Sequence, residues 1–178
     1  PKLVAAGYNR TCLVSPSNVL HCIGSGDIPE TDPGMLGNFE QIELGEGVAC
    51  MLVQGSVYCW GTGSQGQLGK GREQRSETPV EVTNIDDVPL SGIVAIDVGR
   101  SHACAINRTG RLFCWGSNGS GQAAPNSSDG RIARPVDLSV DATDVACGAG
   151  HTCVVDSDGN VWCWGDNRNR EASADFRS

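Results

Sequence analysis

The chain has 178 residues, with 21 acidic against 13 basic side chains and a net charge of -8. The acidic excess argues against a nucleic-acid or anionic-membrane surface, and no apolar run approaches the ~20 residues of a transmembrane helix. This length favours one domain, and 24 glycines with scattered Asp, Asn and Ser predict short strands and many loops.

Four similar units follow one another along the chain, and each reads as a β-hairpin with one cysteine in each arm. A glycine lies five residues before the first cysteine of every unit, and Trp-Gly follows the second cysteine in three of the four, with Ile23-Gly24 in the first. In chain order the cysteine pairs are Cys12 and Cys22, Cys50 and Cys59, Cys104 and Cys114, and Cys153 and Cys163. The repeats cover approximately residues 1–26, 40–71, 92–122 and 141–171 of a single segment, 1–178.

The hairpin loops predict that the two cysteines of each unit face each other. Three units space their cysteines ten residues apart, which predicts three-residue loops with Asn18, Gly110 or Gly159 in a left-handed conformation. The second unit is one residue shorter and carries the two-residue loop Gln54-Gly55, which restores the same register. Facing residues of neighbouring antiparallel strands are close enough for a disulfide.

The connections between hairpins supply further strand candidates: 79–82, 93–96 and 135–138. The connection from Ser25 to Glu43 is shorter and lacks a clear candidate for one strand. Hairpin strands such as 161–164 are apolar on both faces, so both faces should be covered. Small sheets stacked face to face around an axis meet this requirement, and the sequence therefore predicts an all-β propeller.

The repeat resembles the regulator of chromosome condensation repeat. The resemblance is carried by the four in-phase cysteine units and by the segments Trp60 to Gly69 and Trp115 to Gln122, whereas the fourth unit departs after Asn167. It implies a β-propeller of typically seven blades, so four repeats correspond to an arc or fragment of a ring. The best-known family member exchanges guanine nucleotides on chromatin, which the paired cysteines and the acidic charge do not favour here.

The cysteines have two interpretations. As four disulfides, each closing a small loop, they would stabilise the fold by about 2–3 kcal/mol apiece and would indicate an oxidising compartment. As metal ligands, Cys147, His151, Cys153 and Cys163 could bind zinc, but the other three pairs would stay unexplained. The odd cysteine, Cys147, is either a buried free thiol or an intermolecular bridge.

Other motifs have plain structural explanations. Residues 61–66 match G-x-G-x-x-G, but Gly69, Gly71 and Pro79 follow where a nucleotide site needs a helix. His102 and His151 share one repeat position, which favours a structural role, such as a hydrogen bond to the backbone of a neighbouring strand. No side chains stand out as catalytic residues, metal ligands or cofactor ligands. Candidate N-glycosylation sites are Asn9, Asn107, Asn118 and Asn126.

These observations predict a secreted or cell-surface, disulfide-stapled propeller that binds proteins or assembles with itself and is not an enzyme. Its contact surfaces would be the terminal blades and the loops 70–77, 123–134 and 166–170. We expect no nucleic-acid partner and no membrane insertion. Because the chain starts at Pro1 and shows no signal peptide, it reads as a mature or trimmed segment. The alternatives are a secreted enzyme inhibitor and a lyase or glycan hydrolase that uses rim carboxylates.

Overall fold

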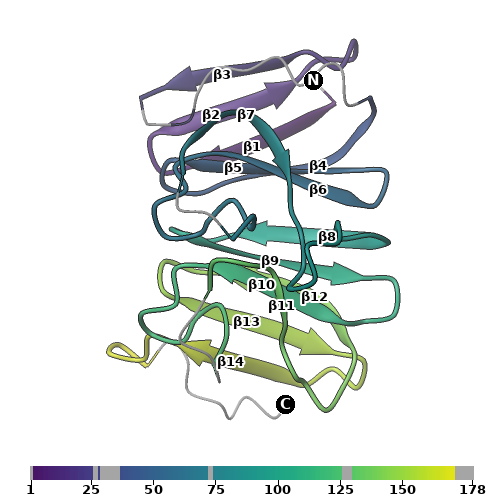
Figure 1. The fold of residues 1–178 in the computed structure, drawn as a ribbon, viewed down its shortest axis with the longest axis vertical. Helices are drawn as coiled ribbons and strands as arrows, with labels where there is room; N and C mark the ends of the chain where they lie inside the picture. The colour runs from purple at the N-terminus through teal and green to yellow at the C-terminus, as the bar shows by residue number, and fades with distance from the viewer. Residues whose placement is uncertain (1, 26–27, 29–36, 72–73, 126–129, 171–178) are drawn as a thin grey trace.

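A computed structural model describes residues 2–25, 28, 37–71, 74–125 and 130–170, and these residues form four antiparallel sheets without a helix. Figure 1 shows the sheets stacked in chain order, and we call them blades one to four. Blade one contains β1 (Leu3–Gly7), β2 (Arg10–Val14) and β3 (Leu20–Gly24). Blade two contains β4 (Phe39–Leu44), β5 (Val48–Val53), β6 (Ser56–Gly61) and β7 (Ser76–Glu81). Blade three contains β8 (Ile93–Val98), β9 (His102–Asn107), β10 (Leu112–Gly116) and β11 (Arg134–Pro135), and blade four contains β12 (Ala142–Cys147), β13 (His151–Asp156) and β14 (Val161–Gly165).

The hairpin loops have the backbone conformations that the cysteine spacing predicts. Asn18, Gly110 and Gly159 have φ angles of 63°, 77° and 83°, in the left-handed region. In the two-residue loop, Gln54 and Gly55 both have positive φ, as a type I′ turn requires. The cysteines of each hairpin are consequently direct cross-strand partners.

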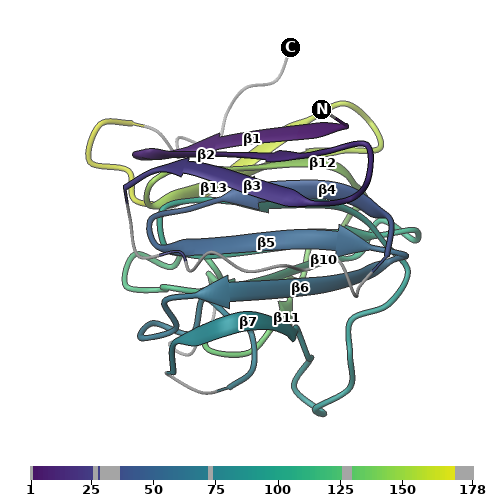
Figure 2. The same ribbon diagram turned by 90° about the horizontal axis from the view of Figure 1, so that it is seen from above.

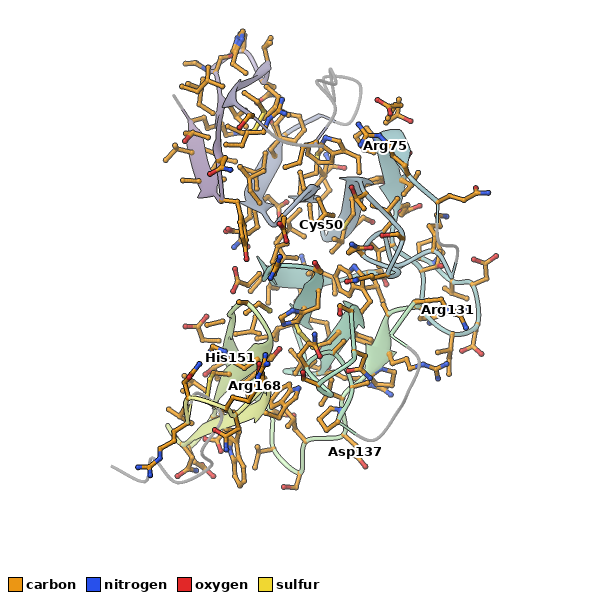
Figure 3. All side chains as sticks on the ribbon, turned by 90° about the vertical axis from the view of Figure 1, so that its left-hand side faces the viewer. Cys50, Arg75, Arg131, Asp137, His151 and Arg168 are labelled. Carbon is orange, nitrogen blue, oxygen red and sulfur yellow. A yellow bond between two sulfur atoms is a disulfide. The ribbon has the colours of Figure 1, made fainter. Side chains whose placement is uncertain are left out.

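The blades form an arc with the first strand of each blade on the inside. Neighbouring blades touch there through β1 with β4, β4 with β8, and β8 with β12. Figure 2 shows β1, β4 and β12 toward one side of the molecule, with β7 and β11 on the opposite, outer side. Figure 3 views the stack from the side and places Arg75 and Arg131 on that outer side, away from His151.

A separate apolar cluster fills each of the three junctions between blades. One face of every blade carries the cysteines and the other carries the residue at the tryptophan position, because facing alternates along a strand. The cysteine face of each blade packs against the tryptophan face of the next. This stacking explains why the central strands read as apolar on both faces.

The outermost strands differ in part from the expectation. β7 overlaps the predicted strand 79–82 in part and β8 contains the predicted strand 93–96, but β11 ends at Pro135, so only the first residue of the predicted strand 135–138 belongs to it. Val136 N–H still bonds Leu112 O at 2.9 Å, and the chain then turns, with Leu138 N–H bonding Val136 O at 3.0 Å. Within the described residues, blades one and four have three strands each.

Candidate functional site

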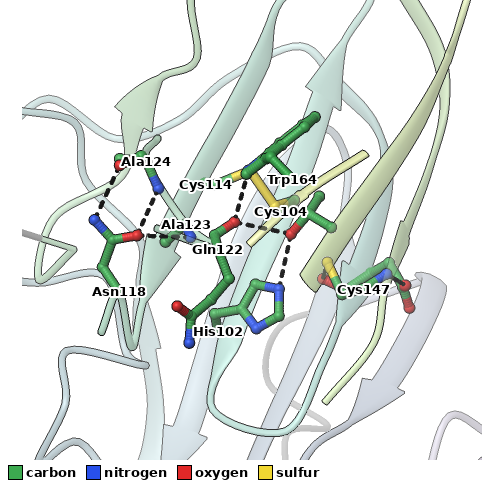
Figure 4. The surroundings of a disulfide bond; sticks show 11 residues. His102, Cys104, Cys114, Asn118, Gln122, Ala123, Ala124, Cys147 and Trp164 are labelled. Carbon is green, nitrogen blue, oxygen red and sulfur yellow. Dashed lines mark hydrogen bonds between the residues drawn. A yellow bond between two sulfur atoms is a disulfide. The ribbon is translucent and has the colours of Figure 1, made fainter. Parts of the chain in front are cut away.

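Each later blade is fastened to the one before it by a tryptophan side chain. The Trp115 indole Nε1 donates to the main-chain oxygen of Gln67 at 2.9 Å, and Trp164 Nε1 donates to Gln122 O at the same distance. The glutamine side chains shape the acceptor loops, because Gln122 Oε1 accepts Ser120 N–H. Figure 4 shows the second of these contacts beside the Cys104–Cys114 disulfide. The Trp-Gly and Gly-Gln segments of the repeat are therefore two halves of one junction.

The recurrent glycine before each first cysteine lies where inner strands approach most closely. A Cβ atom on Gly45 would lie 2.5 Å from the carbonyl oxygen of Gly99, closer than real Cβ contacts allow. A Cβ on Gly99 would likewise collide with the carbonyl oxygen of Gly148 and with the ring of His102. Gly7, Gly45 and Gly99 are required by the packing between blades, because each has a carbonyl of the next blade against its α-carbon, whereas a Cβ on Gly148 would collide with the ring of His151 in its own blade.

His102 connects blade three to blade four through a buried hydrogen-bond chain. Its Nε2 lies 2.8 Å from Thr152 Oγ1, and Thr152 Oγ1 donates to Gln122 O at 2.9 Å (Figure 4). The Thr152 hydroxyl donates its one proton to Gln122 O, so it accepts a hydrogen bond from His102. Nε2 of His102 must therefore carry the proton. Burial, and then the charge of His151, lower the pKa of His102 from 6.5 to about 4. His102 thus has the structural role that its repeat position predicts: beside the side chain of Thr152, a hydrogen bond to the backbone of His151 in the next blade acts on its ring.

Four disulfides join Cys12 with Cys22, Cys50 with Cys59, Cys104 with Cys114, and Cys153 with Cys163. The zinc alternative does not fit, because Cys153 and Cys163 form a disulfide and a disulfide sulfur is not a thiolate ligand. Within the described residues, no group of three or more His, Cys, Asp or Glu side chains is placed to hold a metal. The two middle disulfides are completely buried, whereas Cys153 and Cys163 remain partly exposed on the last blade.

Cys147 is the free cysteine of the described chain, and it lies at the inner junction of blades three and four. Its Sγ donates to Asp97 O at 3.6 Å, and its N–H donates to the Asp97 carboxylate. Burial, and then the charge of Asp97, raise the pKa of the Cys147 thiol well above its ordinary value. A neutral thiol in this setting is a poor nucleophile, so the structure assigns Cys147 to packing.

Blade one presents its tryptophan face to solvent. Val4 and Ile23 on this face are 68% and 71% exposed. The corresponding residues of blade two, Ile42 and Trp60, are 4% and 0% exposed, because blade one covers them. We call this surface the first terminal face; it consists of Val4, Ala6, Thr11, Leu13, His21 and Ile23.

Blade four presents its cysteine face to solvent. Ala146 is exposed there, and Val155 and Val161 are half-buried. Their counterparts in blade three, Ile106 and Leu112, are 2% and 1% exposed beneath blade four. We call this surface the second terminal face; it consists of Asp144, Ala146, His151, Cys153, Val155, Val161 and Cys163, and Asp144 on it is exposed.

The structure describes the predicted rim loops only in part, and the described parts line a hollow or form ion pairs. Lys70 and Arg75 line an outer hollow of 580 Å³ between blades two and three, and Arg75 pairs with Glu77 at 2.7 Å. Within 166–170, Arg168 pairs with Asp166 at 2.5 Å. Parts of the loops 70–77 and 123–134 lie outside the described residues. A second hollow of 360 Å³ lies between blades one and two at the loops that follow their inner strands, beside Tyr8 and Glu46.

The four sequons are not equivalent in the structure. Asn9 is exposed, and Asn107 uses only its carbonyl oxygen, which accepts Thr109 N–H at 3.1 Å. Asn118 donates its Nδ2 to Ala124 O at 3.0 Å and so has its amide engaged inside a loop. Asn126, favoured by the sequence, lies outside the described residues.

The stacked three- and four-stranded sheets, with their first strands gathered on the inside, define an arc of a β-propeller. Models of the regulator of chromosome condensation (RCC1) repeat match residues 54–106, 93–122 and 142–171. The chain belongs to this RCC1 repeat family. No helix of the described residues has the length and apolarity to span a bilayer.

Similar proteins place the arc within larger chains. The human probable E3 ubiquitin-protein ligase HERC6 is 37% identical over 87 residues, which are 48% of this chain and 8% of HERC6. The crystal structure of human WBSCR16 aligns with a TM-score of 0.79 at 20% identity, covering 96% of this chain and 50% of that one. The CRINKLY ectodomain of the Arabidopsis thaliana receptor kinase ACR4 aligns with a TM-score of 0.58 at 19% identity, covering 93% and 56%. This chain therefore spans about half of these solved propellers.

Proposed function

We propose that this chain is an extracellular, non-enzymatic propeller module that binds proteins through its two terminal faces. The observation that carries the proposal is the exposure of Val4 and Ile23, whose counterparts in blade two are buried by a neighbouring blade. Apolar groups at positions built for blade packing stabilise a complex when they leave water. A blade-like protein surface is the partner that fits them.

The compartment is argued from the disulfides. Four disulfides within 178 residues are typical of proteins from oxidising compartments, where thiols are not kept reduced. The likeness to a receptor-kinase ectodomain concerns the fold alone, so the proposed compartment is supported by the disulfides.

The absence of chemistry is argued from how the polar groups are used. Asp156 is buried and accepts Trp162 Nε1 at 2.8 Å, a bond that lowers the pKa of Asp156 to about 2. Asp97 holds the backbone of the next blade, and His102 holds Thr152. These groups fasten the blades, which supports a scaffold role over catalysis.

Site-directed photocrosslinking tests the proposal. A benzophenone amino acid at Ile23 or Val155 should give covalent protein adducts in the natural source, whereas the same probe at exposed Ile85, outside both terminal faces, should give none. An absence of adducts at both terminal positions contradicts the binding function. Non-reducing peptide mapping of the isolated protein should recover four disulfides, and eight reactive thiols would overturn the extracellular assignment.

A further inference from the structure

We propose that Asn107 carries an N-linked glycan, so that the loop between β9 and β10 is a modification site of this protein. The sequence offers four candidate asparagines, and the structure distinguishes this one from the others. The inference rests on the proposed function, because only a chain that passes through a secretory compartment meets the transferring enzyme. The attached group would be an oligosaccharide, linked through its first sugar to the side-chain amide nitrogen of Asn107.

The loop holds the Asn107 side chain by its oxygen alone. Asn107 Oδ1 accepts Thr109 N–H at 3.1 Å, the Thr109 hydroxyl at 2.8 Å and Arg111 N–H at 2.9 Å. The amide Nδ2 of Asn107 donates to no residue that the structure describes. Because an asparagine amide has two N–H donors, a sugar can replace one hydrogen here and leave every hydrogen bond of the loop in place.

The sibling loops show that the hairpin requires an oxygen at this position and no nitrogen. Ser15 in blade one accepts Val19 N–H through its hydroxyl oxygen at 3.0 Å. Asp156 in blade four accepts the N–H groups of Asp158 and Asn160 through one carboxylate oxygen, at 2.9 and 2.8 Å. An acceptor oxygen therefore closes the loop, and serine or aspartate supplies it as well as asparagine does.

The second polar atom at this position has partners in blade four and none among the described residues of blade three. Asp156 Oδ2 accepts Trp162 Nε1 at 2.8 Å. The residue of blade three that corresponds to Trp162 is Phe113, whose ring has no N–H and has the Arg111 guanidinium over it, 5.5 Å from the ring centroid. The hydrogen bonding of the loop thus leaves the amide nitrogen of Asn107 unused.

The loop has open space around it. Arg108 and Thr109 are exposed at its tip, and Asn107 is half-buried at its base. A hollow of 570 Å³ borders the loop beside the connection 136–141, with Thr109 and Arg111 in its wall. A glycan is bulky and hydrated, so a folded chain tolerates it only where there is room and access to water. This loop meets both conditions.

Asn118 does not meet them. Its Nδ2 donates to Ala124 O at 3.0 Å, and its Oδ1 accepts the N–H groups of Ala123 and Ala124, both at 2.9 Å (Figure 4). A sugar on this nitrogen would enter the loop that presents Gln122 O to Trp164 of the next blade. Because N-glycans are attached before the chain has folded, a glycan on Asn118 would hinder that junction.

The other two candidates differ from Asn107 as well. Asn9 is exposed, but it lines the hollow between blades one and two, and its sequon runs directly into β2, to which Thr11 belongs. A glycan there would occupy space at a contact between blades. Asn126 lies outside the described residues. Asn107 is therefore the described sequon that combines an unused amide nitrogen with a position in an exposed loop.

The modification is a group transfer from a lipid-linked oligosaccharide diphosphate. A bond forms between Nδ2 of Asn107 and C1 of the first sugar, and the bond between that carbon and the diphosphate oxygen breaks. Nδ2 loses one proton to a base of the transferring enzyme, and the lipid diphosphate leaves with the electron pair of the broken bond. The chain supplies the nucleophilic nitrogen and, at Thr109, the hydroxyl that completes the sequon.

Peptide mapping of the protein isolated from its natural source tests the inference. Trypsin cleaves after Arg100 and Arg108, so Asn107 lies in the peptide 101–108, separate from Asn118 and the remaining sequons. Peptide N-glycosidase in heavy-oxygen water converts a glycosylated asparagine into heavy-oxygen aspartate. We expect this label at Asn107 and an unlabelled asparagine at Asn118, and tandem mass spectrometry of the reduced and alkylated peptides detects both.

Variants of the full natural chain, produced in the natural source, identify the site independently. Asn107→Asp should reduce the glycosidase-dependent shift on a denaturing gel by one glycan, and it should fold because aspartate keeps the acceptor oxygen, as in Asp156. Thr109→Ala should cause the same loss, whereas Thr109→Ser, which preserves the sequon, should retain the shift. Ser120→Ala is the matched control: it removes the sequon of Asn118 at an exposed side chain and should leave the shift unchanged.

An unmodified Asn107 in a protein whose four disulfides are formed overturns the inference and leaves the extracellular assignment standing. A Thr109→Ala chain that keeps the whole shift also overturns it, because the glycan then lies elsewhere. If mapping finds reactive thiols in place of the disulfides and no glycan at Asn107, the extracellular assignment and the inference fall together. If Asn107 is glycosylated but photocrosslinking at the terminal faces yields no adducts, the modification stands and the binding function falls.

Discussion

Trp115 Nε1 donates to the main-chain oxygen of Gln67 at 2.9 Å, across 48 residues of sequence and from one blade to the next. Both groups are buried, so neither can exchange this hydrogen bond for one to water. Trp164 repeats the contact with Gln122. In the junctions of blades two and three and of blades three and four, an indole hydrogen bond thus helps to fix the height of one blade against the other, beside the apolar clusters that fill these junctions.

Trp115→Phe should lower the free energy of unfolding by about 1–3 kcal/mol, because it leaves the buried Gln67 carbonyl without its donor. Trp162→Phe is the comparison, since Trp162 is 39% exposed and its acceptor Asp156 keeps a bond from Asn160 at 3.0 Å. Its effect should be smaller. Urea denaturation measures both, and equal losses would contradict the role of the Trp115 bond.

Gly99→Ala should destabilise the fold by about 1–3 kcal/mol or more, because the new methyl group enters the space of the Gly148 carbonyl and the His102 ring. Gly119→Ala is a suitable control, since a Cβ there meets nothing within 4 Å. The thermal midpoints of the two variants should separate by several degrees. A Gly99→Ala protein as stable as the Gly119→Ala protein would show that the junction can open without cost.

The stability of the fold should decrease as the pH falls from 6.5 to about 4. Burial holds the pKa of His102 at about 4, whereas the unfolded chain binds a proton at this residue near pH 6.5. The unfolded state then binds more protons in this window, which costs up to about 3 kcal/mol by pH 4. Unfolding measured across this range should show the loss, and His102→Gln should remove most of it. A His21→Gln variant at an exposed site should keep the full pH dependence.

The four disulfides should be reduced in an order set by their burial. Cys153 and Cys163 remain partly exposed, whereas Cys50, Cys59, Cys104 and Cys114 are completely buried. Mild reduction of the folded chain, followed by alkylation and peptide mapping, should label Cys153 and Cys163 first. Early labelling of the buried pairs would contradict this order.

Much of the local structure was predictable because local chemistry decides it. The spacing of Cys104 and Cys114 around a glycine that tolerates positive φ determines the hairpin register, and the four units repeat that solution. The apolar character of both strand faces implied coverage on both sides and therefore stacked blades. The short extent of β11 was missed, since the chain turns after Val136, where Leu138 N–H bonds Val136 O, although the apolar residues suggested a longer strand.

Contacts between blades could not be predicted in the same way. The sequence shows Gly99, His102 and Trp115 recurring at fixed positions, but it does not say what lies opposite them. The carbonyl of Gly148, the hydroxyl of Thr152 and the carbonyl of Gln67 come from segments about fifty residues away. Only the stacking of one blade on another brings these groups together.

The sequence by itself therefore determined the repeat, the cysteine pairing and the propeller class, because turn geometry and strand alternation act over a few neighbouring residues. Only the tertiary structure decided which faces are covered. It buries Ile42 and Trp60 beneath blade one and leaves Val4 and Ile23 in solvent. Burial depends on which blades are adjacent, so residues of similar chemistry become core in the middle of the arc and exposed surface on its first and last blades.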